Sequence, residues 1–172
     1  MRSAHLLAGS LLAAMAPLAA SQPNDGDERM VRDYAMTVAK IASGFINLAG
    51  SEENAVALVE ALFHGEPVKL VYPSAPSQDG TPSVTTIEPP TGRMEWNDVR
   101  MALMLARDAL VSVGISRPPG ELLRTVMMGG DFVAPRGRLV NFRGVLQMRA
   151  EGHNWGRIAS ERFQRRAVAR VE

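Results

Sequence analysis

A chain that begins like a secretory signal peptide and holds no cysteine has to fold by packing alone. Arg2 and His5 lie in a short polar start, an apolar stretch runs from Leu6 to Ala16, and small residues follow up to Ser21. This order is typical of a cleaved signal peptide. The apolar stretch is also shorter than the roughly 20 residues of a membrane-spanning helix. We therefore expect cleavage near Ser21 and a periplasmic or secreted protein, with an uncleaved N-terminal anchor as the alternative.

The lack of cysteine excludes several kinds of chemistry for an exported protein. None of the 172 residues is a cysteine. A lipid anchor on a cysteine, disulfides, thiol nucleophiles and thiolate-bound metals are all excluded. About 151 residues remain after the expected cleavage, which is enough chain for one domain with a hydrophobic core.

The composition along the chain predicts a simple domain organisation. We expect a signal peptide over residues 1–21, a polar spacer over 22–27, one globular domain over 28–163 and a basic tail over 164–172. Pro, Gly and Asp in the segment 22–27 favour a loose connection over regular structure.

Hydrophobic periodicity predicts two helices at the start of the domain. One apolar stripe has spacings of three and four residues, and it consists of Val31, Tyr34, Val38, Ile41, Phe45 and Leu48. Such spacing is typical of an amphipathic helix. Gly50 would end this helix and Ser51 would cap a second, which runs to about Phe63. The short link between them predicts an antiparallel helical hairpin.

The middle of the chain predicts strands and two further helices. Val68–Tyr72 and Ser83–Ile87 read as a β-hairpin around a Pro-rich loop. A third helix, capped by Asn97 or Asp98, is apolar around most of its circumference and should therefore be central. A fourth helix follows Pro118 and Pro119, and a second small hairpin includes residues 132–134 and 138–142. The predicted fold class is α+β: a mostly helical single domain with one or two small β-hairpins and a C-terminal helical hairpin.

The C-terminal segment, Gly144 to Phe163, resembles the first two helices of a helix-turn-helix unit. The alternative is a helical hairpin that closes the core through Trp155 and Ile158. The sequence pattern expected for the third helix of a DNA-binding unit is poorly matched in this chain. A signal peptide would also direct the protein away from chromosomal DNA. We therefore favour the packing hairpin and expect no DNA in the native compartment.

Charge is distributed unevenly along the chain. Residues 22–135 carry nine basic and fifteen acidic side chains, whereas residues 136–172 carry nine arginines and three glutamates. The two halves could neutralise each other, or the second could bind a polyanion. The candidate polyanion-binding residues are Arg143, Arg149, Arg157, Arg162, Arg165 and Arg166.

Neither a metal site nor a catalytic site is predicted. After cleavage the remaining histidines, His64 and His153, are far apart in sequence and lack the spacing of a zinc motif. Met101 and Met104 could suit Cu(I), but methionine more often fills gaps in cores. Asp131 and His153 are the loop positions that most merit inspection for catalysis. No nucleophile motif or phosphate-binding loop accompanies them, so we expect no cofactor and lean against an enzyme.

Three blocks of the sequence resemble a family of uncharacterised exported proteins of proteobacteria. The blocks are FINLAGSEENAVALVEALFHG (45–65), PPTGRMEW…VRMALMLA (89–106) and GVL…RAEGHNWGRIA (144–159). That family typically reads F-A-G-S followed by N-A in the first block and G-W-G-x-I-A in the last. The resemblance implies export and a shared fold, but no activity. It also implies that Met101 and Met104 are packing residues, because the family more often has Ile or Leu there.

These observations lead to two functional expectations. The first is a non-catalytic interaction or structural protein of the bacterial envelope, whose partner could be another envelope protein or an anionic surface. The alternative is binding of a polyanion, either a membrane surface or a nucleic acid, through the arginine-rich, helix-turn-helix-like C-terminal third.

Overall fold

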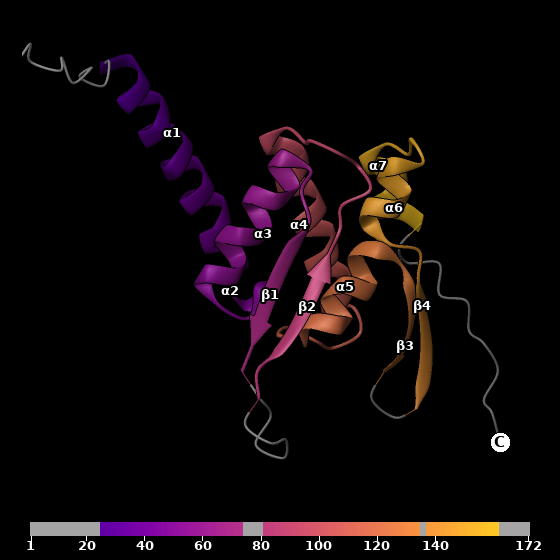
Figure 1. Ribbon diagram of the computed structural model, residues 1–172. Coiled ribbons are helices and arrows are strands. Elements are labelled where there is room, and N and C mark those ends of the chain that lie inside the picture. Colours follow the sequence, from indigo (N-terminus) through magenta and orange to yellow (C-terminus); the bar gives the residue numbers. More distant parts are fainter. Residues whose placement is uncertain (1–24, 74–80, 135–136, 162–172) are drawn as a thin grey trace, which may run out of the picture.

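The protein is a mostly helical α+β domain with two separate β-hairpins, as the sequence predicts (Figure 1). The computed structural model describes residues 25–73, 81–134 and 137–161. The elements in chain order are α1 Asp25–Ala42, η1 Ser43–Phe45, α2 Ile46–Ala49, α3 Glu52–His64, β1 Val68–Tyr72, β2 Ser83–Ile87, α4 Trp96–Val111, α5 Gly120–Met128, β3 Gly130–Ala134, β4 Arg138–Phe142, α6 Val145–Ala150 and α7 Trp155–Glu161. None of the helices in these described ranges is long and apolar enough to cross a membrane.

The first helix differs from the prediction at both ends. Helix α1 begins at Asp25, so the last three residues of the expected spacer 22–27 are helical instead. Three acidic residues in its first turn favour a helix start, because their negative charge interacts favourably with the positive end of the helix dipole. The single stripe expected up to Leu48 is broken at η1, where the Ser43 hydroxyl donates to the carbonyl of Lys40 over 3.0 Å. Such a bond competes with the helical backbone, and Gly44 follows it.

The first β-hairpin has the predicted strands and supplies one wall of the core. Strand β1 pairs antiparallel with β2 in a register that places Val68 opposite Ile87 and Tyr72 opposite Ser83. Buried and exposed side chains alternate along β1. Helix α3 packs against β1, and helix α5 packs against β2. The buried face of the hairpin therefore lies against helices, while the other face is exposed.

Asn54 joins the helical half of the domain to the free edge of β1. Its side-chain amide donates to the carbonyls of Ala49 (3.0 Å) and Val71 (2.8 Å), and its carbonyl oxygen accepts from the backbone N–H of Val71 (3.0 Å). The buried side chain thus occupies the position of a neighbouring strand at Val71. The Ser51 cap that the sequence predicts is confirmed, because the Ser51 hydroxyl accepts from the backbone N–H of Asn54 over 3.1 Å.

Helix α4 is the central helix, as its apolar circumference predicts. It packs against α3, α5 and α6, and the buried residues along it include Leu103, Ala106 and Leu110. The prediction that Asn97 or Asp98 caps it is wrong, because α4 begins at Trp96 after a Glu95 that makes no side-chain cap.

Asp98 instead fixes the C-terminal helical hairpin to α4. Its carboxylate accepts from the indole Nε1–H of Trp155 over 2.7 Å and from the guanidinium of Arg149 over 3.2 Å. The Arg149 guanidinium also lies over the Trp155 ring, 4.8 Å from its centroid. Ile158 of α7 is fully buried. Helices α6 and α7 therefore form the packing hairpin that the sequence favours over a DNA-reading unit.

We predict that Asn54→Ala lowers the free energy of unfolding by about 1–3 kcal/mol, because two backbone groups of Val71 lose their buried partners. The matched control is Tyr72→Phe. The Tyr72 hydroxyl is buried, lacks a hydrogen-bond partner in the described part of the chain and has its pKa raised to about 12 by that burial. Its removal should leave stability unchanged or slightly higher. Urea denaturation of both variants measures the difference, and equal stability of Asn54→Ala and wild type would contradict the role of Asn54.

Candidate functional site

An aromatic cluster joins α1, the end of α3 and the start of α4. The rings of Phe63 and Trp96 are stacked, with centroids 3.8 Å apart and planes at 11°. Tyr34 of α1 lies against both, with its centroid 5.9 Å from that of Phe63 and 5.6 Å from that of Trp96. Arg93 covers Phe63, with its guanidinium carbon 4.9 Å from the ring centroid. The cluster joins α1 to the corner between α3 and α4, and hollows lie beside it.

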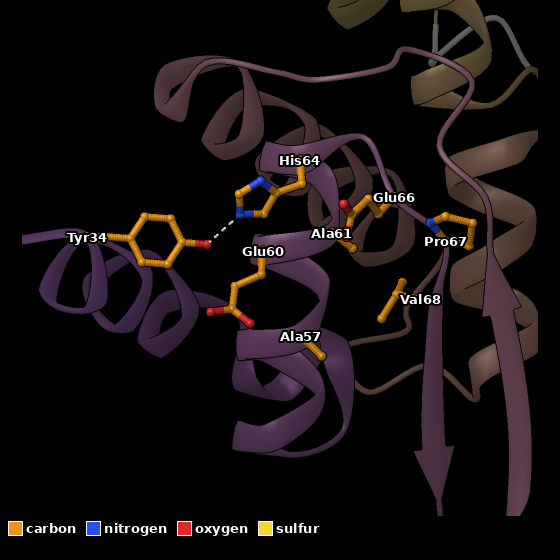
Figure 2. A pocket seen from close by; sticks show the side chains of 8 residues that line it. All are labelled: Tyr34, Ala57, Glu60, Ala61, His64, Glu66, Pro67 and Val68. Carbon is orange, nitrogen blue, oxygen red and sulfur yellow. Dashed lines mark hydrogen bonds between the residues drawn. The ribbon is translucent and has the colours of Figure 1, made fainter. Parts of the chain in front are cut away.

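The hollow on the α3 side is acidic and shallow. Figure 2 shows Tyr34 pointing from α1 toward His64, with Glu60 and Glu66 at the same hollow. Its volume is about 320 Å³. A hydrogen bond of 2.9 Å joins the Tyr34 hydroxyl to Nε2 of His64. Burial raises the pKa of Tyr34, and the charges of Glu60 and Glu66 raise it further. The hydroxyl is thus held protonated, which suits a structural hydrogen bond better than a catalytic base.

The hollow on the α4 side is larger and basic, and we call it the basic groove. Its volume is about 630 Å³. Its lining combines lysine and arginine side chains with aromatic, aliphatic and thioether groups. It is lined by Thr37, Lys40, Ile41, Gly44, Phe45, Trp96, Asn97, Arg100, Met101, Met104 and Arg107. Helical spacing explains the arrangement, because positions three and four apart on α1 and on α4 share a face.

The charge of the basic groove is not neutralised from within. It contains Lys40, Arg100 and Arg107, and no aspartate or glutamate is among the lining residues. Within the described ranges, neither Lys40 nor Arg100 forms an ion pair. Arg107 lies 3.8 Å from the carboxylate of Asp108 and also covers the Phe45 ring at 5.4 Å. An anionic group in the groove would therefore meet a positive field beside an apolar surface.

Met101 and Met104 belong to this groove and not to the core. Met104 is 36 % exposed and Met101 is half-buried, which corrects the expectation that both are packing residues. Methionine is flexible and polarisable, and it recurs on binding surfaces that adapt to their ligands. The described residues contain no group of three histidine, cysteine, aspartate or glutamate side chains that could hold a metal ion.

The candidate polyanion-binding arginines that the structure describes are paired with carboxylates. Arg149 pairs with Asp98, and Arg143 pairs with Glu151 over 3.3 Å and with Glu161. Arg157 also pairs with Glu161, whose carboxyl pKa is lowered first by the hydrogen bond from Arg157 and then by nearby positive charge. The remaining candidates, Arg162, Arg165 and Arg166, lie outside the described residues. Polyanion binding by the full set stays a prediction.

The two loop positions singled out for catalysis lie in separate elements. Asp131 is in β3, and its carboxylate accepts from the side chain of Asn141 over 2.7 Å, which makes it half of a cross-strand pair. His153 links α6 and α7, with its ring nitrogens 3.8 Å from Glu151 and 3.9 Å from Glu161. Its Nδ1 is buried and forms no hydrogen bond with the described residues. Neither residue lines the basic groove or the acidic hollow.

Comparisons with models of known protein families, with curated protein sequences and with solved structures find no match. The functional argument therefore rests on the geometry of the chain itself.

Sequence reasoning did not find the basic groove, although one signal for it was present. Met101 and Met104 fall on the polar side of α4, beside Arg100 and Arg107. Apolar side chains among cations on an outward helix face indicate a surface that the other elements of the domain leave partly uncovered. The second wall, from α1 and η1, depends on the break at Ser43, which periodicity alone did not reveal.

Proposed function

We propose that this protein is a non-catalytic interaction protein of the bacterial envelope, which binds an acidic amphipathic segment of a protein partner in the basic groove. The observation that carries the proposal is the lining of the groove, which contains three cations, no carboxylate, and aromatic and thioether groups. Tryptophan, phenylalanine, methionine and arginine are the residue types enriched in protein interfaces. Carboxylates of the partner would steer it to the groove, and its apolar side chains would supply the affinity.

The shape of the groove favours a peptide segment over an extended anionic surface. Met101 and Met104 line the groove from α4, the helix that also carries Arg100 and Arg107. A bound helix presents apolar side chains along one face with charged ones beside them, which matches this arrangement. A flat membrane surface or a polyphosphate backbone would use the cations but not the methionines. The described arginines of the C-terminal hairpin are already paired with carboxylates, which reduces the charge that they offer to a ligand.

We predict that a synthetic amphipathic helix of glutamate and leucine binds the purified protein and shifts the fluorescence of Trp96 in the groove. Lys40→Glu combined with Arg100→Glu should weaken binding about 10-fold or more, equivalent to ~1.4 kcal/mol. Lys69→Glu changes an exposed cation on β1, away from the groove, and is the matched control that should bind like wild type. Titration monitored by fluorescence, with calorimetry as a second readout, measures these affinities.

Two results would contradict the groove as the binding site. One is that the double variant binds the peptide as tightly as Lys69→Glu does. The other is binding of heparin that is stronger than binding of the peptide and equally sensitive to the double variant, which would assign the groove to polyanions in general. A Met104→Asn variant separates charge from apolar contact, because it removes the thioether without adding charge, and it should also weaken peptide binding while leaving the cations in place.

The envelope part of the proposal rests on the N-terminal segment, which lies outside the described residues. We predict that the protein recovered from the periplasm or medium of an expressing bacterium begins at Gln22 or one residue earlier. Intact-mass spectrometry measures this directly. Recovery only from the cytoplasm, with residues 1–21 still attached, would contradict export.

A further inference from the structure

The first half of α1 extends beyond the domain and has no buried residue, although Met30 and Asp33 border an open hollow beside Trp96. Figure 1 shows α1 projecting away from the other helices and from both hairpins. Every residue from 25 to 33 is exposed, whereas the buried residues of α1 all lie at its other end. We call residues 25–33 the arm.

The arm continues the same apolar stripe that holds α1 to the domain. Tyr34, Val38 and Ile41 face the domain, and the helical repeat places Val31 and Met30 next along that face. Met30 is 71 % exposed and Val31 is 68 % exposed. A stripe that packs at one end and faces solvent at the other indicates a surface that a partner covers.

The charge of the arm is complementary to that of the basic groove. The arm carries Asp25, Asp27, Glu28 and Asp33 against Arg29 and Arg32, so acidic groups outnumber basic ones four to two. The groove carries three cations and no acid. Lengths agree as well: nine helical residues span about 13 Å, and the groove follows α4 from Asn97 to Arg107, about 15 Å.

A chain cannot place its arm in its own groove. Thr37, Lys40 and Ile41 of the same α1 helix form one wall of the groove, and α1 is continuous from Asp25 to Ala42. The arm is therefore directed away from the groove that its own helix borders. Only a second molecule can bring an arm to it.

We propose that the arm of one copy docks in the basic groove of a second copy, and that the second arm docks in the first groove in return. This inference rests on the proposed function, since it names the acidic amphipathic segment as a stretch of this chain. Reciprocal exchange makes the two contacts equivalent and closes the assembly as a two-fold dimer.

Charge reversal on the two sides provides the test. The arm variant is Asp25→Lys, Asp27→Lys and Glu28→Lys, and the groove variant is Lys40→Glu with Arg100→Glu. Sedimentation equilibrium should show dimers of wild type and at least a 10-fold larger dissociation constant for each variant alone. A mixture of the two variants should form heterodimers again, because each arm then meets a groove of opposite charge. Glu88→Lys, an exposed change outside both surfaces, is the matched control and should dimerise like wild type. Circular dichroism of each variant checks that it is folded.

The outcomes show whether arm exchange fails alone or together with the proposed function. A protein that stays monomeric, or dimers that ignore both reversals, would overturn arm exchange while peptide binding in the groove still stands. Two variants that dimerise no better when mixed would also overturn it. If the wild-type protein neither binds the peptide nor self-associates, both proposals are overturned together.

Discussion

The stack of Phe63 on Trp96 is the contact on which the functional part of this structure depends. It joins the last turn of α3 to the first turn of α4, and Tyr34 adds α1 to the same cluster. Aromatic rings bury a large area in a fixed geometry, so three helices from distant parts of the sequence are held at one point. Tyr34 of this cluster lines the acidic hollow, Trp96 lines the basic groove, and the arm precedes Tyr34 on α1.

The chain contains two sets of basic residues, which differ in whether carboxylates pair with them. The described arginines of the C-terminal hairpin are paired with Asp98, Glu151 and Glu161, where they fasten α6 and α7. Lys40 and Arg100 line the basic groove and have no carboxylate partner among the described residues. Exposed ion pairs contribute little to stability, but they remove charge that a ligand could use. Clusters of unpaired cations beside apolar side chains are the more informative feature.

Much of the fold could be predicted from the sequence because local patterns decide it. The strands 68–72 and 83–87 and the helix that starts after Pro119 follow alternation, capping and proline chemistry, and each is confirmed. The start of α1 at Asp25 was missed because a single glycine and the nearby proline suggested a spacer. The break at Ser43 was missed because the apolar stripe runs on through it.

The site was much less predictable, because it is made of contacts between distant segments. Met101 and Met104 read as core residues, since the helix period alone does not say which partner covers an outward face. Asp98 read as a cap, whereas it binds Trp155 and Arg149 more than fifty residues away. The resemblance to exported proteobacterial proteins stays a prediction, and the functional proposals depend on the groove and the arm.

The most direct test of the central claim is an NMR titration of the protein with ¹³C-labelled methionine methyl groups. Met101 and Met104 lie in the basic groove, whereas Met127 and Met148 are buried in the core. Addition of the acidic amphipathic helix should shift the methyl signals of Met101 and Met104 to saturation and leave those of Met127 and Met148 in place. Unmoved groove signals at saturating peptide, or equal shifts in groove and core, would contradict the account.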